Sequence, residues 1–292
     1  MKKPIVIKSL STIADKFDTF ILDQWGVIHD GRKNYNHALK CIEKLSKLDK
    51  KLVIISNSSK RVEHAVTFLN KIGFNENLFV EIITSGQLIW DEINKPKLTW
   101  SKKLGNKCFH LYNNQKKSNT NFTIGLNKTF INQIDKADFI LGTVVNPNMT
   151  VIDHMPILEK AIKRDLPFIC ANPDYESVET INNKKMICMG TIAKLYENIG
   201  GKVYLLGKPS SYIYKKATAN IKNLDKSRTL AIGDSIPHDI QGARNFGIKS
   251  MLITLGVHKK LFLDNNLSLE NNFRDFKDFH FMPDFLSKKL EY

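Results

Sequence analysis

The sequence has little of what secreted and membrane proteins rely on. Its 292 residues contain four cysteines, Cys41, Cys108, Cys170 and Cys188, with no C-x-x-C spacing. Since the first three lie among apolar neighbours, we interpret them as small core side chains in a reducing compartment, not as disulfides or zinc ligands. No apolar run approaches the roughly 18 residues of a membrane span, and the N-terminal apolar stretch is too short for a signal peptide. These absences predict a cytoplasmic protein without a membrane partner.

Long runs of one charge sign are also missing, although the formal net charge is +15, from 44 Lys and Arg against 29 Asp and Glu. A field of this sign attracts anionic small molecules or nucleic acid. The lysines are scattered, however, and the basic stretches at 49–51 and 113–117 have no interleaved aromatic residues on which bases could stack. A generally Lys-rich composition accounts for the charge, so we predict no nucleic-acid partner.

Short apolar runs that alternate with amphipathic segments dominate the first hundred residues. The runs at 17–22, 52–55 and 81–83 are each followed by a segment with apolar side chains at helical spacing. Strands that alternate with helices in this way are typical of a doubly wound parallel sheet. The sequence therefore predicts an α/β fold with a Rossmann-like core.

The pattern changes near residue 98, where shorter strands and Asn-rich connections begin. We interpret 98–187 as an inserted α/β domain, and 1–97 together with 188–292 as the domain that receives it. In this interpretation the runs 202–206, 228–232 and 250–254 belong to the receiving sheet, and the last of them completes it.

Four of the runs end in polar residues that could do chemistry. These residues are Asp23, Ser56 with Asn57, Lys208, and Asp234 with Asp239. Each has an ordinary structural explanation, because aspartate and serine cap turns and helices and lysine is usually solvated. If all four runs were strands of one parallel sheet, however, their polar ends would meet at a single edge.

Such a group of side chains is suited to phosphoryl chemistry. Carboxylates, with reference pKa values near ~4, repel one another at neutral pH unless a cation joins them. Mg²⁺, which prefers a few carboxylates and several waters, would supply positive charge together with Lys208. The same cations, with Ser56 and backbone amides, would bind the oxygens of a phosphoryl group whose phosphorus Asp23 attacks.

Four stretches occur in a recognisable order between Phe17 and Gly256. They are Ile21-Leu22-Asp23-Gln24-Trp25-Gly26-Val27, Ile54-Ile55-Ser56-Asn57, Gly207-Lys208-Pro209, and Gly233-Asp234 with Asp239. In order and spacing they resemble the haloacid dehalogenase superfamily of aspartate-nucleophile phosphohydrolases.

Two further stretches resemble one branch of that superfamily. Ala171-Asn172-Pro173-Asp174 in the insertion and the later Leu255-Gly256-Val257-His258 are similar to class IIA, which includes phosphoglycolate, pyridoxal-phosphate, nucleotide and sugar-phosphate phosphatases. The resemblance implies a hydrolase core, a C2-type cap over 98–187 and a small phosphate ester as substrate. Caps of this branch often take part in dimer contacts, so a homodimer is an expectation from the resemblance.

The resemblance also implies roles for the residues that would bind the substrate. Asp23 is the expected nucleophile and would form a phosphoaspartate. Ser56 and the Asn57 amide would bind the transferring phosphoryl group, while Lys208 would steady that group and Asp23. The expected substrate contacts in the cap are Asn172 and Asp174.

For the metal, the resemblance implies oxygen ligands from three residues. Asp23, Asp234 and the backbone carbonyl of Trp25 would hold Mg²⁺. Asp239 would support the metal through water or through the groups that bind it.

One position departs from the family pattern. Phosphatases of the superfamily have a second aspartate two residues after the nucleophile, which serves as acid for the leaving group and base for the water, and this chain has Trp25 there. Losing general acid–base catalysis typically costs about 10²- to 10⁴-fold, so slow turnover is expected. Water, Asp174, His29, Asp30 or a good leaving group could compensate, although His29 is also explained as an ordinary loop residue.

Three functions are consistent with these residues. We predict a Mg²⁺-dependent phosphohydrolase of a sugar phosphate, nucleotide or similar metabolite. The first alternative is a non-catalytic or weakly active protein that binds phosphate esters. The second is a hydrolase of carbon–halogen or other non-phosphate bonds, since dehalogenases of the superfamily also lack the second aspartate. Asp234 and Asp239 argue against the second alternative, because halide displacement needs no Mg²⁺.

Overall fold

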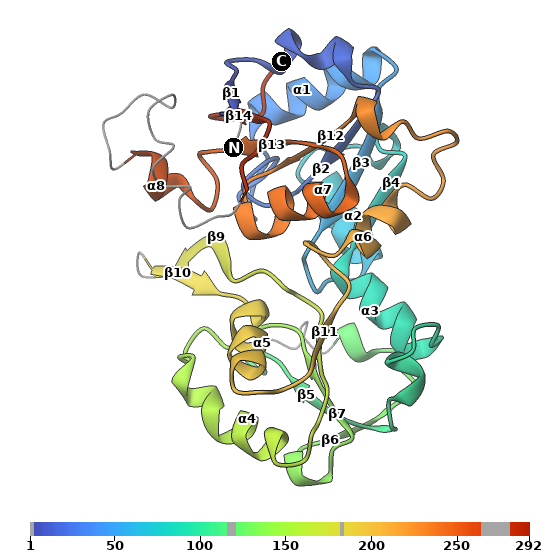
Figure 1. Ribbon diagram of the computed structural model, residues 1–292, viewed down its shortest axis with the longest axis vertical. Coiled ribbons are helices and arrows are strands. Elements are labelled where there is room, and N and C mark those ends of the chain that lie inside the picture. The colour runs from blue at the N-terminus through green and yellow to red at the C-terminus, as the bar shows by residue number, and fades with distance from the viewer. Residues whose placement is uncertain (1–2, 116–120, 182–183, 264–280) are drawn as a thin grey trace. The chain divides into compact units, whose positions relative to one another are not determined.

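The structure is a computed structural model that describes residues 3–115, 121–181, 184–263 and 281–292 (Figure 1). The chain divides into two compact units. Unit 1 comprises Met1–Ser56, Glu63–Ile83 and Lys208–Tyr292, and unit 2 comprises Asn57–Val62 and Thr84–Gly207.

Unit 1 is built around a seven-stranded sheet with the strand order β1-β14-β13-β12-β2-β3-β4. From β1 to β3 the neighbouring strands pair in parallel. The strands are β1 (Ile5–Val6), β2 (Thr19–Leu22), β3 (Lys51–Ser56), β4 (Glu81–Thr84), β12 (Thr229–Gly233), β13 (Lys249–Ile253) and β14 (Phe285–Ser287). The predicted α/β fold with a parallel sheet at its core is confirmed.

The centre of this sheet is apolar on both faces. All four residues of β2 and all five of β12 are buried, as expected for inner strands of a parallel sheet covered by helices. In the register, Leu22 lies beside Ile232 on one neighbour and Ile54 on the other. The polar residues that follow these three strands therefore leave the sheet at the same edge.

Helices of unit 1 pack against this sheet through apolar stripes. In α1, the buried residues are Ala38, Cys41, Ile42 and Leu45, which lie three or four positions apart. Both α1 and α6 contact β3, while α7 contacts β13 and α6. The helices are α1 (Asn36–Lys47), α2 (Val62–Lys71), α6 (Ser211–Ala217), α7 (Gln241–Phe246) and α8 (Lys259–Leu263).

Unit 2 has a parallel sheet of its own, with five strands in the order β11-β8-β7-β5-β6. An antiparallel pair, β9 with β10, forms a separate two-stranded sheet. The strands are β5 (Lys107–Leu111), β6 (Thr129–Ile131), β7 (Phe139–Gly142), β8 (Phe168–Cys170), β9 (Glu176–Ile181), β10 (Lys184–Ile187) and β11 (Val203–Leu205). The helices are α3 (Ser85–Asn94), α4 (Met155–Ile162) and α5 (Met189–Asn198).

The assignment of the run 202–206 to the first sheet was wrong. β11 pairs in parallel with β8 of unit 2, with Val203 beside Phe168. An apolar strand preceded by a helix suits either of two parallel sheets, and its side-chain pattern does not distinguish them. α5 packs against both β8 and β11, and this packing places β11 in the sheet of unit 2.

The first sheet also extends beyond the strand at which the sequence predicted its end. β14 lies next to β13, and β1 lies beyond β14 at the edge. With two and three residues, β1 and β14 are too short to show a periodic pattern of apolar side chains.

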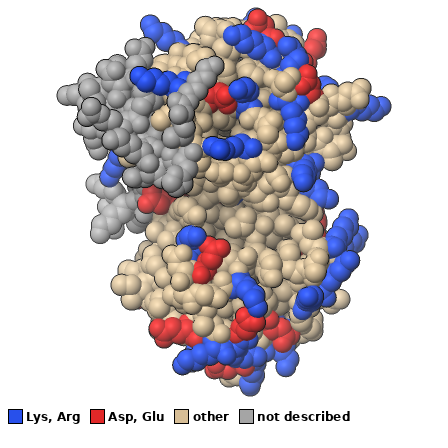
Figure 2. Space-filling view, in the orientation of Figure 1, with Lys and Arg blue, Asp and Glu red and all other residues tan. Residues whose placement is uncertain are grey.

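Charged side chains are spread over the face drawn in Figure 2, with Asp and Glu among the more numerous Lys and Arg. This distribution agrees with the scattered lysines of the sequence. In the part of the chain that the structure describes, no helix has both the length and the apolar content that crossing a membrane requires.

Candidate active site

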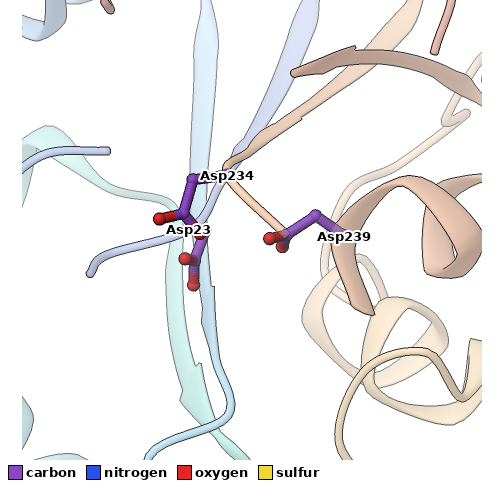
Figure 3. Close-up of side chains that lie close together, drawn as sticks. All are labelled: Asp23, Asp234 and Asp239. Carbon is purple, nitrogen blue, oxygen red and sulfur yellow. The ribbon is translucent and has the colours of Figure 1, made fainter. Parts of the chain in front are cut away.

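Three aspartates lie together at the carboxyl edge of the first sheet. Asp23 follows β2, Asp234 follows β12, and Asp239 lies in the π-helical turn Ile236–Ile240. One carboxylate oxygen from each lies within 4.8 Å of the others, and all three residues are buried. In Figure 3 the carboxylates of Asp23 and Asp234 lie side by side, and Asp239 points toward them from its turn. The structure thus brings these three predicted site residues together.

Lys208 joins two of these carboxylates. Its Nζ donates to Asp23 Oδ1 at 2.6 Å and to Asp239 Oδ1 at 2.7 Å, and its side chain is 2% exposed. The sequence predicted that Lys208 lies at the end of a strand of the first sheet, and this part of the prediction was wrong. The chain leaves β11 of the second sheet and enters unit 1 at Lys208.

The cluster has more negative than positive charge. Burial raises the pKa of Asp234 well above its usual range, and the carboxylates of Asp23 and Asp239 raise it further. The Val257 N–H, which donates to Asp234 Oδ2 at 2.7 Å, and the more distant Lys208 act in the opposite direction. A second cation beside Asp234 would remove this penalty.

The donor set fits a divalent metal. Buried carboxylate oxygens held close together are the ligands that hard cations such as Mg²⁺ prefer. Asp23 and Asp234 are the residues that would hold the ion. Both oxygens of Asp239 already accept hydrogen bonds, Oδ1 from Lys208 and Oδ2 from the Ser235 N–H at 3.0 Å, which suits a residue that supports the site without binding the metal directly.

A loop that the sequence left without a role lies against Asp234. Besides the Val257 N–H, this loop carries His258, whose Nε2 accepts a hydrogen bond from the Ile236 N–H at 3.1 Å. Gly256 packs so closely that a Cβ there would lie 2.2 Å from the Asp234 Cβ. The motif Leu255-Gly256-Val257-His258 was the available signal, and its function here is to hold the Asp234 carboxylate.

A buried tyrosine was also missed. The Tyr214 hydroxyl donates to the backbone carbonyl of Asp239 at 3.2 Å, and burial raises the pKa of Tyr214 well above its usual value. It therefore acts as a neutral hydrogen-bond donor beneath the turn that carries Asp239. Nothing in the sequence around Tyr214 marks it as more than one apolar position of α6.

The predicted phosphate-binding and cap residues fall in two places. Ser56 ends β3 and is 1% exposed. Asn57 belongs to unit 2, where its Nδ2 donates to Asp174 Oδ1 at 2.7 Å. Asn172 Oδ1 accepts from the Asp174 N–H at 3.2 Å, so Asn57, Asn172 and Asp174 form one hydrogen-bonded group.

Trp25 is half-buried and packs on its own loop. Its ring lies edge-on to His29 with centroids 5.1 Å apart, and His29 lies equally close, at 5.2 Å, to Phe68 of α2. His29 is fully buried, and its Nδ1 accepts a hydrogen bond from the Gly31 N–H at 3.0 Å. His29 therefore serves the packing of this loop, as the ordinary explanation of a loop histidine anticipated.

Asp30 also has a structural role in this loop. Its Oδ1 accepts hydrogen bonds from the Arg32 and Lys33 N–H groups, both at 2.9 Å. Burial acts to raise the pKa of Asp30, but these hydrogen bonds and the Lys33 charge outweigh it, so the pKa is lowered. Asp30 is consequently ionised at neutral pH and caps a turn.

We predict that Asp234→Asn raises the melting temperature at neutral pH in the presence of a chelator. Because the pKa of Asp234 is higher in the folded than in the unfolded protein, the folded protein loses stability as the pH rises from the unfolded-state pKa toward the folded-state pKa. Asparagine does not ionise, so it removes this loss, and its amide oxygen still accepts a hydrogen bond from the Val257 N–H. Thermal unfolding with EDTA and with Mg²⁺ measures the effect. Mg²⁺ should raise the melting temperature of the unchanged protein more than that of the variant, and equal responses would contradict this prediction.

Gly256→Ala is predicted to weaken Mg²⁺ binding at least tenfold. The added methyl overlaps the Asp234 side chain and must displace either the carboxylate or the Val257 N–H. Calorimetric titration with Mg²⁺ measures the change. Leu255→Ala is the matched control, because Leu255 is an exposed neighbour on the same loop, and it should leave Mg²⁺ affinity within twofold.

Comparison with known proteins agrees with this geometry. The family model described as haloacid dehalogenase-like hydrolase matches residues 20–121, and the one described as HAD-hydrolase-like matches residues 205–277. A 4-nitrophenylphosphatase of Schizosaccharomyces pombe is 23% identical, covering 87% of this chain and 89% of its own length.

Two solved structures share the fold over nearly the whole chain. A hydrolase of the haloacid dehalogenase-like family from Brucella suis is 25% identical with a TM-score of 0.79, covering 97% of this chain and 99% of that one. A possible sugar phosphatase of the HAD superfamily from Cytophaga hutchinsonii is 18% identical with a TM-score of 0.76, covering 98% of each chain. The two matched family models, the shared fold and the aspartate cluster agree: over most of its length this chain is similar to the haloacid dehalogenase-like hydrolases.

Proposed function

We propose that the protein is a Mg²⁺-dependent phosphohydrolase of class IIA that acts on a small phosphorylated metabolite, such as a sugar phosphate or a nucleotide. The observation that carries this proposal is the buried cluster in which Lys208 bridges Asp23 and Asp239 beside Asp234. The names of two relatives, a 4-nitrophenylphosphatase and a possible sugar phosphatase, point in the same direction.

In the proposed mechanism, Asp23 attacks the phosphorus and forms a phosphoaspartate that water then hydrolyses. A carboxylate repels a phosphate dianion, and Lys208, 2.6 Å from Asp23 Oδ1, offsets that repulsion. Ser56 and the backbone amide of Asn57 would hold the oxygens of the transferring group.

The metal would be held by Asp23, Asp234 and the backbone carbonyl of Trp25. When bound, Mg²⁺ would neutralise charge on the phosphoryl oxygens. Asp239 fixes Lys208 by their 2.7 Å ion pair, and Ser235 fixes Asp239 in turn. The cluster would thus enter the reaction with its lysine already oriented.

We assign the hydrolase core to unit 1 and the cap to unit 2, whose main segment, Thr84–Gly207, is wider than the 98–187 expected from the sequence. Within unit 2, the hydrogen-bonded group of Asn57, Asn172 and Asp174 is where we place contacts to the substrate. The four cysteines are free thiols, which supports a place in the reducing cytoplasm.

One observation favours a second function, a phosphate-ester-binding protein that turns over slowly or not at all. Trp25 occupies the position at which phosphatases of the superfamily have an acid, and its ring is packed against His29. A protein of this kind would bind phosphate esters without releasing phosphate. A hydrolase of carbon–halogen bonds is disfavoured, because halide displacement needs no Mg²⁺, the ion that the carboxylates of Asp23 and Asp234 would hold.

Phosphate release tests the proposal directly. With Mg²⁺ we expect release from 4-nitrophenyl phosphate and from at least one member of a panel of sugar, nucleotide and glycolate phosphates, and we expect EDTA to abolish it. Asp23→Asn should reduce release by at least 10³-fold, since the amide is not a nucleophile.

The matched control is Asp18→Asn. Asp18 is a half-exposed aspartate at the other end of β2 that pairs with Arg228 at the surface, so its loss should leave phosphate release unchanged. Activity that survives in Asp23→Asn would remove Asp23 as the nucleophile. A folded protein that binds phosphate but releases none from any ester would establish the binding function instead.

A further inference from the structure

The Trp25 indole is held rigidly at the position two residues beyond the proposed nucleophile. Gly31, with φ of +88°, lies so close that a Cβ there would be 2.1 Å from an indole carbon. His29 packs edge-on against the ring and is itself supported by Phe68. The only polar group of the indole, Nε1–H, donates hydrogen bonds but does not serve as an acid. This position therefore presents a fixed aromatic surface with no proton to give.

The titratable residues that follow on the same loop serve its structure instead. His29 is fully buried between two aromatic rings, with Nδ1 bound to the Gly31 N–H. Asp30 is bound to two backbone N–H groups in its turn. Neither side chain is arranged to transfer a proton to a substrate.

The charged groups of the cluster are engaged with one another. Lys208 donates to Asp23 and Asp239, Asp239 also accepts from Ser235, and Asp234 accepts from Val257. These bonds place charge around the phosphoryl group. Among the described residues of this loop and cluster, none is placed to protonate the oxygen that departs, and Asp174 of unit 2 is engaged as the acceptor of a hydrogen bond from Asn57.

The chemistry of the first step then limits the substrate. A bond forms from an Asp23 oxygen to phosphorus while the bond from phosphorus to the leaving oxygen breaks, and the electron pair stays on the leaving oxygen. Without an acid at the position of Trp25, that oxygen departs as an anion and takes its proton from water. In the second step water attacks phosphorus, the bond to Asp23 breaks, inorganic phosphate leaves, and the proton of the water passes to solvent.

The stability of the departing anion decides which esters react. The anion of a carboxylic acid, with a reference pKa of about 4, or of a phenol, at about 10, is much less basic than the alkoxide of a sugar or glycerol. We propose that Trp25 restricts this site to phosphoryl groups on oxygens of low basicity, as in acyl phosphates, phosphoanhydrides and aryl phosphates, and disfavours alkyl phosphates. This inference rests on the proposed function and narrows its substrate class to compounds with an activated phosphoryl group, such as nucleotides with a phosphoanhydride, while alkyl esters such as most sugar phosphates become poor substrates.

The test is the dependence of kcat/KM on the leaving group, measured with Mg²⁺ on the full-length protein. A series of substituted phenyl phosphates, from 4-nitrophenyl to unsubstituted phenyl, keeps the shape of the substrate nearly constant while its leaving-group pKa rises. We expect log kcat/KM to fall steeply along the series. Glycerol phosphate should be slower than 4-nitrophenyl phosphate by about 10²- to 10⁴-fold. Acetyl phosphate and pyrophosphate, as separate arms, show whether acyl phosphates or anhydrides are preferred.

Two variants at one position separate proton transfer from packing. Trp25→Asp supplies an acid and should flatten the dependence on leaving group, mainly by raising the rate on glycerol phosphate. Trp25→Asn removes the same ring and matches aspartate in size but has no proton to transfer. The asparagine variant should keep the steep dependence.

Each other outcome counts against the inference. Equal kcat/KM for glycerol phosphate and 4-nitrophenyl phosphate in the unchanged protein would overturn it while leaving the proposed function intact, because another group would then be the acid. A dependence as flat in Trp25→Asn as in Trp25→Asp would also overturn it. No turnover of any substrate, in folded protein that binds inorganic phosphate, would overturn the proposed function and this inference together.

Discussion

The pair of hydrogen bonds from one buried ammonium group to two carboxylates is the interaction on which this site depends. Lys208 reaches Asp23 and Asp239 at 2.6 and 2.7 Å with almost no exposure to solvent. Removing one partner of such a buried pair typically costs about 3–5 kcal/mol, because the remaining charge has no compensation. The arrangement requires the chain to leave one sheet at β11 and enter the other unit at the lysine itself.

Backbone groups around the cluster do as much to arrange it as the charged side chains. The Ser235 N–H donates to Asp239, and the Val257 N–H donates to Asp234. His258, next to Val257, accepts a hydrogen bond from the N–H of Ile236, next to Ser235, and so joins the two segments. Because these donors are part of the backbone, they hold the carboxylates of Asp239 and Asp234 in place. The acidic side chains of the site are thus oriented before any ligand binds.

Much of this site followed from the sequence. Apolar runs that end in Asp23, Ser56 and Asp234 predicted strands of one parallel sheet whose polar ends share an edge, and the parallel pairing of β12, β2 and β3 agrees. The loop after Asp23 was harder to interpret, because its sequence shows the change to Trp25 but not its consequence. Only the packing of Gly31 and His29 on the indole shows that the ring is fixed.

The sequence by itself determined the fold class, the central strands and the aspartates, because apolar runs and the residues that end them are local patterns. The tertiary structure alone decided that β11 joins the second sheet, that β1 and β14 extend the first, and that the loop of Val257 and His258 holds Asp234. These relations depend on which surfaces pack together, and partners more than twenty residues apart leave no periodic signal in the chain. For Lys208, the sequence identified the residue, and the fold determined how its side chain reaches the carboxylates.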